Sequence, residues 1–158
     1  ALWGLAFKPE TDDMREAPAL VLIDKLIEAG ASVKVYDPIA MDECRRRIGD
    51  KVVYATDMYD AVLDADALLL VTEWKEFRMP SWGVLKKTMR QAVVVDGRNI
   101  YEKPELQELE IVYDCIGTKD LNGNYYTYGG DEIDRKGKIY PYGLERRPNN
   151  EFEIEPIN

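Results

Sequence analysis

The chain begins with ALWGLAFKPETDDMREAP (residues 1–18), which predicts a buried strand, then a charged loop, then the start of a helix. Pro18 suits the first turn of a helix, where its missing N–H would have no partner in any case. In an open α/β sheet, the loop that leaves the carboxyl end of a strand lines the ligand crevice. This loop holds an aromatic side chain, Phe7, and two cations, Lys8 and Arg15. An apolar surface beside cations suits a nucleotide and its phosphates, so we expect a binding site here.

Predicted strands and helices alternate from this loop to about residue 117. Apolar residues recur at helical spacing between residues 18 and 29, and Gly30 supplies a left-handed stop. Residues 67–71 are all Leu, Val or Ala, which is typical of a parallel strand covered on both faces. We therefore predict an α/β fold, a doubly wound Rossmann-like parallel sheet flanked by helices. The predicted strands are 1–6, 33–36, 52–54, 67–71, 92–95 and 111–113, and the predicted helices are 18–29, 41–48, 58–63 and 82–89.

The composition changes at Thr118, beyond which glycine, proline and tyrosine are frequent and hydrophobic periodicity is weak. We predict two parts, an α/β domain over residues 1–117 and an irregular C-terminal tail or arm over residues 118–158. Residues 126–129 and 140–143 resemble each other, which is consistent with two strands of a hairpin or with a biased linker. The linker is preferred, because a single echo is not a repeat array.

The net charge of −9 argues against nonspecific nucleic-acid binding, which requires a basic surface. No apolar run approaches the roughly 20 residues that span a bilayer, and nothing resembles a signal peptide, so we expect no membrane partner and a cytoplasmic location. Ala1 already lies inside a predicted strand, which leads us to expect a piece of a longer protein.

The two cysteines, Cys44 and Cys115, lack the C-x-x-C spacing, and the chain has no histidine. Neither a metal site of the zinc type nor a Cys-His nucleophile pair is therefore expected. Arginines follow Cys44 directly, and such neighbours lower the pKa of a thiol. We nevertheless interpret Cys44 as a thiol on a helix surface, and both cysteines as reduced structural residues.

Residues 4–18, GLAFKPETDDMREAP, resemble the start of the C-terminal domain of UDP-glucose 6-dehydrogenases. Related GDP-mannose dehydrogenases usually vary the residue after the lysine, so Pro9 favours the UDP-glucose branch. The resemblance covers about residues 1–117, and it implies that they form a nucleotide-sugar (UDP)-binding domain. It implies an enzyme that uses NAD to oxidise UDP-glucose to UDP-glucuronate in two hydride transfers.

The resemblance also implies further parts of the full-length enzyme, whose sequence motifs are not found in this chain. These parts are an N-terminal NAD-binding domain and a long central helix that pairs subunits, so the full-length protein is expected to be a homodimer or larger. The family's nucleophilic cysteine sits in a glycine-rich motif of the region before this domain, and neither Cys44 nor Cys115 resembles it. We therefore expect no catalytic residue in this chain, and no activity from it alone.

Four positions of this sequence match residues that bind ligands in the family. The resemblance assigns Phe7 and Lys8 to the nucleotide sugar, Arg15 to the NAD cofactor, and Arg98 to the nucleotide part of the substrate. Arg98 is a candidate ligand-binding residue even without the resemblance. It follows Gly97 at the carboxyl end of the predicted fifth strand, on the same side of the sheet as Lys8. The alternative for Arg98 is a tight turn with its guanidinium in solvent. The alternative for Lys8 and Arg15 is a pair of solvated cations, balanced by acidic neighbours at positions 12, 13 and 16.

Three further residues lie at the same predicted edge. Trp74 and Phe77 follow the fourth strand, and covering the end of the sheet is their preferred role. Asp37 follows the second strand, where dinucleotide-binding domains place an acidic residue against a ribose. The G-x-G-x-x-G motif that accompanies such a residue is absent, so we interpret Asp37 as part of the loop structure and do not expect the principal NAD site here.

Two other functions remain open at this point. One is the oxidation of GDP-mannose or UDP-N-acetylmannosamine by an enzyme of the same architecture. A flavodoxin-like signalling module is the alternative from another class, with Thr72 as its switch threonine. That alternative lacks a clustered acidic pocket and a lysine after the fifth strand.

Overall fold

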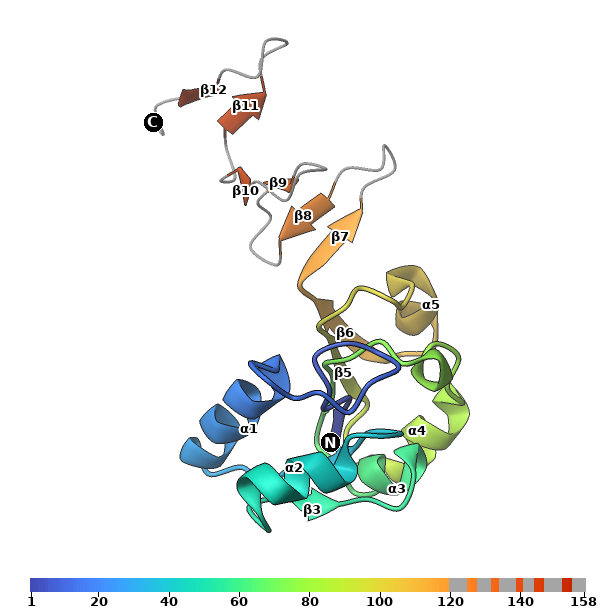
Figure 1. Ribbon diagram of the computed structural model, residues 1–158. Coiled ribbons are helices and arrows are strands. Elements are labelled where there is room, and N and C mark those ends of the chain that lie inside the picture. The colour runs from blue at the N-terminus through green and yellow to red at the C-terminus, as the bar shows by residue number, and fades with distance from the viewer. Residues whose placement is uncertain (120–124, 128–131, 134–138, 141–143, 147–151, 155–158) are drawn as a thin grey trace. The chain divides into compact units, whose positions relative to one another are not determined.

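A computed structural model describes the fold of residues 1–119, 125–127, 132–133, 139–140, 144–146 and 152–154 (Figure 1). The chain divides into two compact units, Ala1–Asp114 and Cys115–Asn158. Within the described part, no helix is both long enough and apolar enough to cross a bilayer.

The first unit is built on a six-stranded parallel sheet with the strand order β3-β2-β1-β4-β5-β6. The chain therefore runs outward from β1 to one edge and then returns beside β1 to build the other half, which is the doubly wound arrangement that the sequence predicted. A flavodoxin-like sheet would have the order 2-1-3-4-5, so that alternative is excluded. The strands are β1 (Leu2–Trp3), β2 (Lys34–Tyr36), β3 (Val53–Tyr54), β4 (Leu68–Leu70), β5 (Val93–Asp96) and β6 (Val112–Cys115).

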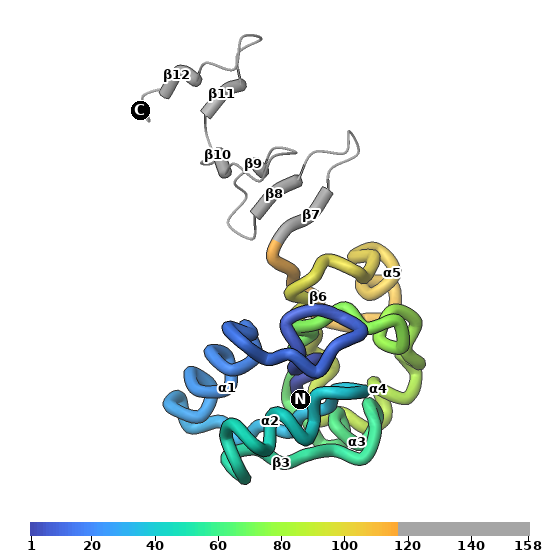
Figure 2. Tube along the Cα trace, in the orientation of Figure 1, coloured from blue at the N-terminus to red at the C-terminus, as the bar shows by residue number. Residues whose placement is uncertain are grey.

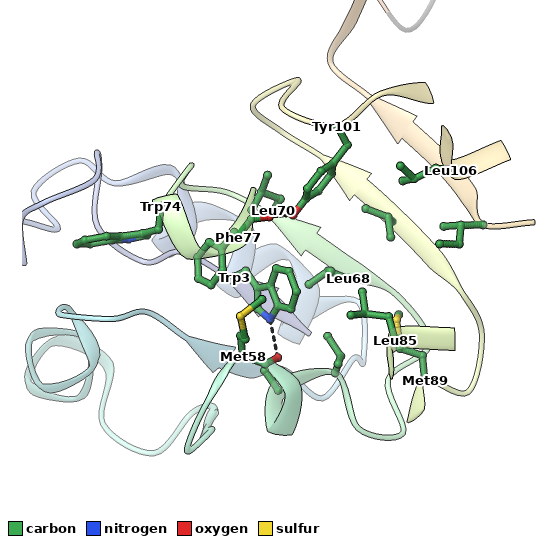
Figure 3. Close-up of a cluster of buried hydrophobic side chains, with 14 of the residues drawn as sticks. Trp3, Met58, Leu68, Leu70, Trp74, Phe77, Leu85, Met89, Tyr101 and Leu106 are labelled. Atoms are coloured by element: carbon green, nitrogen blue, oxygen red, sulfur yellow. Dashed lines mark hydrogen bonds between the residues drawn. The ribbon is translucent and has the colours of Figure 1, made fainter. Parts of the chain in front are cut away.

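Helices cover both faces of this sheet. Side chains alternate between the faces along a strand, so Leu2 packs into one core while its neighbour Trp3 packs into the other. The core on the Leu2 face includes residues from α1 and α2. The core on the Trp3 face, drawn in Figure 3, includes residues from α3, α4 and α5. Trp3 also donates its indole N–H to the carbonyl oxygen of Met58 over 2.9 Å. The helices are α1 (Pro18–Glu28), α2 (Met41–Ile48), α3 (Met58–Val62), α4 (Trp82–Thr88) and α5 (Lys103–Glu108), with a 3₁₀ turn, η1, at Lys75–Phe77.

The first strand is shorter than the predicted 1–6, because the backbone turns at Gly4. Gly4 has a φ of +94°, which disfavours any residue with a side chain. A Cβ at this position would also lie 2.4 Å from the Cβ of Thr72, so the loop after β1 packs directly on the loop after β4. This loop is the dark blue segment that follows the N-terminus in Figure 2.

Helix α5 is absent from the predicted elements. It has only six residues, and only Leu106 among them is buried, so it shows no periodic apolar stripe. Its sequence signal is Pro104 in the first turn, a position that proline favours.

The second unit contains short antiparallel strands in the region where we expected an irregular tail. Strands β7 to β10 form a four-stranded sheet, and β11 pairs with β12. Tyr126 in β8 and Tyr140 in β10 both lie opposite Glu132 of β9, so the two segments that echo each other pair with β9 rather than with one another. The remainder of each echo, residues 128–129 and 141–143, lies outside the described residues. The strands are β7 (Gly117–Lys119), β8 (Tyr125–Thr127), β9 (Glu132–Ile133), β10 (Ile139–Tyr140), β11 (Leu144–Arg146) and β12 (Phe152–Ile154).

Candidate functional site

The candidate residues lie in loops at the carboxyl ends of three adjacent strands, β1, β4 and β5. The loop after β1 holds Phe7, Lys8 and Arg15, and the turn after β5 holds Arg98. Arg98 donates from Nη2 to the carbonyl oxygen of Phe7 over 3.2 Å. The structure therefore brings the loop after β1 and the turn after β5 into direct contact at the carboxyl ends of the strands, where ligands bind in such sheets.

A buried carboxylate, that of Asp37, holds this edge together. Asp37 is only 1% exposed, and it accepts hydrogen bonds from residues of three loops. The interpretation of Asp37 as part of the loop structure is confirmed, because its own chain uses the carboxylate that would otherwise grip a ribose. Its donors are the amides of Leu5 (2.7 Å), Ala6 (3.1 Å), Ile39 (2.9 Å) and Ala40 (2.8 Å) and the indole N–H of Trp74 (3.0 Å).

Phe7 and Lys8 present an aromatic ring and a cation next to each other. The Phe7 side chain is partly exposed, and the ammonium nitrogen of Lys8 lies 5.3 Å from its ring centroid. The amide of Phe7 donates to the carbonyl oxygen of Asp13 over 3.0 Å, which closes the loop between them. Among the residues that the structure describes, Lys8 has no carboxylate partner. This pair is available to a ligand with an apolar surface and a negative charge.

Arg15 lies in the same loop but is paired with its own neighbour. Its Nη2 is 2.7 Å from Oδ2 of Asp13, and its Nε contacts both carboxylate oxygens at 3.1 Å. These hydrogen bonds lower the pKa of Asp13 to about 2. The Arg15 side chain remains 80% exposed, so its guanidinium faces solvent while one edge is occupied. Of the acidic neighbours that the sequence offered as balancing charges, Asp13 is the one that pairs with Arg15.

Arg98 is held by backbone and acidic groups from neighbouring loops. Its Nε donates to the carbonyl oxygen of Val71 over 2.8 Å and lies 3.0 Å from Oε2 of Glu73. The side chain is one third exposed. The alternative interpretation, a turn with its arginine in solvent, is therefore wrong, because the guanidinium braces the loops after β1 and β4.

Asp96 is a residue of this edge that the sequence reasoning missed. Its side chain is fully buried, and Oδ1 accepts the amide of Arg98 over 2.9 Å, which fixes the turn that carries the arginine. The signal available in the sequence was an aspartate as the last residue of a strand before glycine, a common turn opening. The other donors, all to Oδ2, are the amides of Ile100 (2.8 Å) and Tyr101 (3.0 Å) and the hydroxyl of Tyr113 (2.8 Å).

Trp74 and Phe77 have the structural role that the sequence favoured. Both are buried, at 4% and 0% exposure. The Phe77 ring stacks on Trp3 with the ring centroids 4.9 Å apart and an interplanar angle of 16°. This prediction is confirmed, since neither ring is available to a ligand.

The prediction for Cys44 was wrong in one respect. Its thiol is buried against the core on the Leu2 face and does not lie on the helix surface. Burial raises the pKa of Cys44. The alternative in which neighbouring arginines lower that pKa is not favoured, because Arg46 and Arg47 form ion pairs with Glu43 at 2.7 and 2.6 Å. Cys44 is therefore a packing residue, and the spacing of Met41, Cys44 and Ile48 on one helix face was the overlooked signal.

A cavity of about 500 Å³ lies at the opposite end of the sheet, where the strands begin. It is lined by residues at or before the amino ends of the strands, including Ala1, Lys34, Asp66 and Arg90. The four predicted binding residues do not line it, so this cavity is separate from the candidate site.

Comparison with known proteins supplies a family. The sequence model of the UDP-glucose/GDP-mannose dehydrogenase family, UDP binding domain, matches residues 1–103. The chain is 47% identical over 122 residues to a UDP-glucose 6-dehydrogenase of Pseudomonas aeruginosa, covering 74% of this chain and 27% of that protein. It is 43% identical over 120 residues to one of Bacillus subtilis, covering 76% and 26%. The chain thus spans about a quarter of the length of these curated relatives.

Solved structures of nucleotide-sugar dehydrogenases are also similar to this chain. A UDP-glucose dehydrogenase of Pyrobaculum islandicum matches with a TM-score of 0.58 and 35% identity, covering 72% of this chain and 24% of that one. A UDP-D-ManNAc dehydrogenase of Pyrococcus horikoshii matches with a TM-score of 0.58 and 28% identity, covering 73% and 24%.

Proposed function

This chain belongs to the UDP-glucose/GDP-mannose dehydrogenase family, and we propose that it is the UDP-binding domain of a UDP-glucose 6-dehydrogenase. The complete enzyme would oxidise UDP-glucose to UDP-glucuronate in two hydride transfers. NAD, when bound, accepts the hydride. The chain spans about a quarter of its curated relatives, so an NAD-binding domain and the nucleophilic cysteine belong, in this proposal, to the rest of such a protein.

The observation that carries the proposal is the contact between Arg98 and the carbonyl oxygen of Phe7. This hydrogen bond joins the two segments that the family resemblance assigns to the nucleotide sugar. Lys8, which has no carboxylate partner among the described residues, supplies a cation for the diphosphate. Phe7 supplies an apolar surface for the sugar or base, and Arg98 donates to the nucleotide part of the substrate.

The residues of this chain fit a contact with NAD but not the principal NAD site. The carboxylate of Asp37 already accepts five hydrogen bonds within the chain, which removes the usual ribose contact at the end of the second strand. Arg15, with a guanidinium exposed to solvent, is the residue we assign to the cofactor. The role of this chain is accordingly to bind and orient the substrate, and none of its residues is assigned a proton transfer.

Binding of nucleotides to this chain tests the proposal directly. We expect UDP to shift the amide NMR signals of Phe7, Lys8 and Arg98, and GDP at the same concentration to shift them less. A stronger response to GDP than to UDP would favour GDP-mannose as the substrate, equal responses would contradict the preference for UDP, and no response to UDP would overturn the proposal. Comparison of UDP-glucose with UDP-N-acetylmannosamine as substrates of the full-length enzyme would separate the remaining alternative.

The family also leads us to propose a cytoplasmic location and a homodimer or larger assembly for the full-length protein. Both rest on the relatives rather than on residues of this chain. Sedimentation of the full-length protein measures the assembly, and a monomer at micromolar concentration would contradict it.

A further inference from the structure

Glu73 contacts Arg98, the candidate binding residue that also joins two loops by hydrogen bonds. Its Oε2 lies 3.0 Å from Nε of Arg98, but the N–H at that nitrogen is directed to the carbonyl oxygen of Val71. Oε2 is buried and accepts no hydrogen bond within the part of the chain that the structure describes. Glu73 therefore acts on Arg98 through its charge and not through a directed hydrogen bond.

The three cations of the candidate site differ in this respect. Arg98 is compensated by Glu73, and Arg15 is compensated by Asp13 at 2.7 Å. The contacts described for Lys8 place its ammonium against the ring of Phe7, with no carboxylate partner among the described residues. Lys8 is thus the cation whose full charge is available to an anion.

A carboxylate beside a guanidinium opposes the attraction that the guanidinium exerts on a second anion. The carboxylate leaves the remaining N–H groups of the guanidinium free to donate to neutral oxygens. The described residues accept hydrogen bonds from Nε and Nη2 of Arg98, and Nη1 makes none with them. The outer edge of this guanidinium therefore suits a carbonyl or hydroxyl oxygen better than a phosphate.

We propose that Glu73 is a specificity-determining residue of the nucleotide site. It neutralises Arg98, so that Arg98 binds neutral oxygens of the nucleoside and the charge of the diphosphate is left to Lys8. This inference rests on the proposed function, because it assumes that a uridine nucleotide occupies this edge. It adds to that function a residue that is not itself assigned a ligand contact.

The test measures how uridine and UDP bind to the 158-residue chain, by NMR titration at low and high salt. In Glu73→Gln we expect the ratio of UDP affinity to uridine affinity to rise about threefold or more, since a neighbouring charge is no longer compensated. We expect the gain to shrink at high salt, because the attraction is screened. Inorganic pyrophosphate should also bind more tightly to this variant than to the wild type.

Matched variants separate charge from structure. Glu76→Gln makes the same change in net charge three residues away, beside the hydroxyl of Tyr36, and should leave the ratio unchanged. Glu73→Asp keeps the charge and should restore the wild-type ratio, and Glu73→Met replaces the glutamine variant if that one unfolds. An unchanged ratio in the neutral variants, or equal weakening of uridine and UDP, would overturn the inference while leaving the proposed function intact. Absence of UDP binding by the wild type would overturn the proposed function and this inference with it.

Discussion

Arg98 and Phe7 are 91 residues apart in the sequence, yet the guanidinium of one donates to the backbone carbonyl of the other over 3.2 Å. The same guanidinium reaches the carbonyl oxygen of Val71. A residue proposed to bind the nucleotide therefore also joins the loops that carry the other binding residues. Variants at this position affect the shape of the site as well as its chemistry.

Replacing Arg98 by lysine should weaken UDP binding by roughly tenfold or more, because an ammonium cannot reproduce the planar set of N–H donors. Isothermal titration calorimetry with UDP measures the change. Arg90→Lys is the control, since Arg90 pairs with Asp66 at the opposite edge of the sheet and should bind UDP as the wild type does. Wild-type affinity in Arg98→Lys would contradict the assignment of Arg98.

Replacing Asp37 by asparagine should lower the free energy of unfolding by about 2 kcal/mol or more, because an amide NH₂ would face buried donors that need an acceptor. Urea denaturation followed by tryptophan fluorescence measures the loss. Asp57→Asn is the matched control, because Asp57 accepts two amides at the start of α3 and asparagine caps helices about as well as aspartate. Equal stabilities of the two variants would show that the five hydrogen bonds to Asp37 contribute little.

The thiol of Cys44 should react with iodoacetamide about a hundredfold more slowly in the native chain than in denaturant at neutral pH. Burial both shields the sulfur and raises its pKa, which reduces the fraction of the reactive thiolate. Mass spectrometry of the peptide that contains Cys44 measures the labelling at this residue alone. Rapid labelling in the native state would contradict the packing role.

The ion pair between Asp13 and Arg15 should persist at mildly acidic pH. The pKa of Asp13 is lowered from 3.8 to about 2 by the hydrogen bonds from Arg15, so the pair's contribution is fully present above pH 4 and is lost as the pH falls through 2. Carbon NMR of the Asp13 carboxyl group measures this titration directly. In Arg15→Gln the midpoint should return toward 3.8, and an unshifted midpoint would show that another group lowers the pKa.

This chain alone should form no NADH from UDP-glucose and NAD. It lacks the G-x-G-x-x-G motif, and Cys44 is buried, so neither cofactor chemistry nor a thiol intermediate is supported. Absorbance at the NADH band measures the rate, and the Pseudomonas aeruginosa enzyme assayed alongside serves as the positive control. Turnover by the isolated chain would contradict the proposal that the catalytic parts lie elsewhere in the protein.

The sequence predicted the alternation of strands and helices because buried strands and amphipathic helices leave periodic apolar patterns. It missed α5, which buries only Leu106, and it placed Cys44 on the surface because the rest of α2 is mostly charged. The roles of Asp96 and Glu73 depend on contacts with residues far away in the chain, such as Tyr113 and Arg98. These distant contacts follow from the sheet order and leave no local pattern, whereas the turn that Asp96 opens toward Arg98 does have a local signal, the aspartate before glycine.

The buried carboxylate of Asp37 has a thermodynamic consequence for recognition. It joins the loops after β1, β2 and β4 through hydrogen bonds that are present before any ligand binds. A nucleotide that binds at this edge meets a preorganised surface, and little conformational entropy is lost from the protein backbone on association. We therefore expect affinity at this edge to depend more on the quality of the contacts than on the cost of ordering these loops.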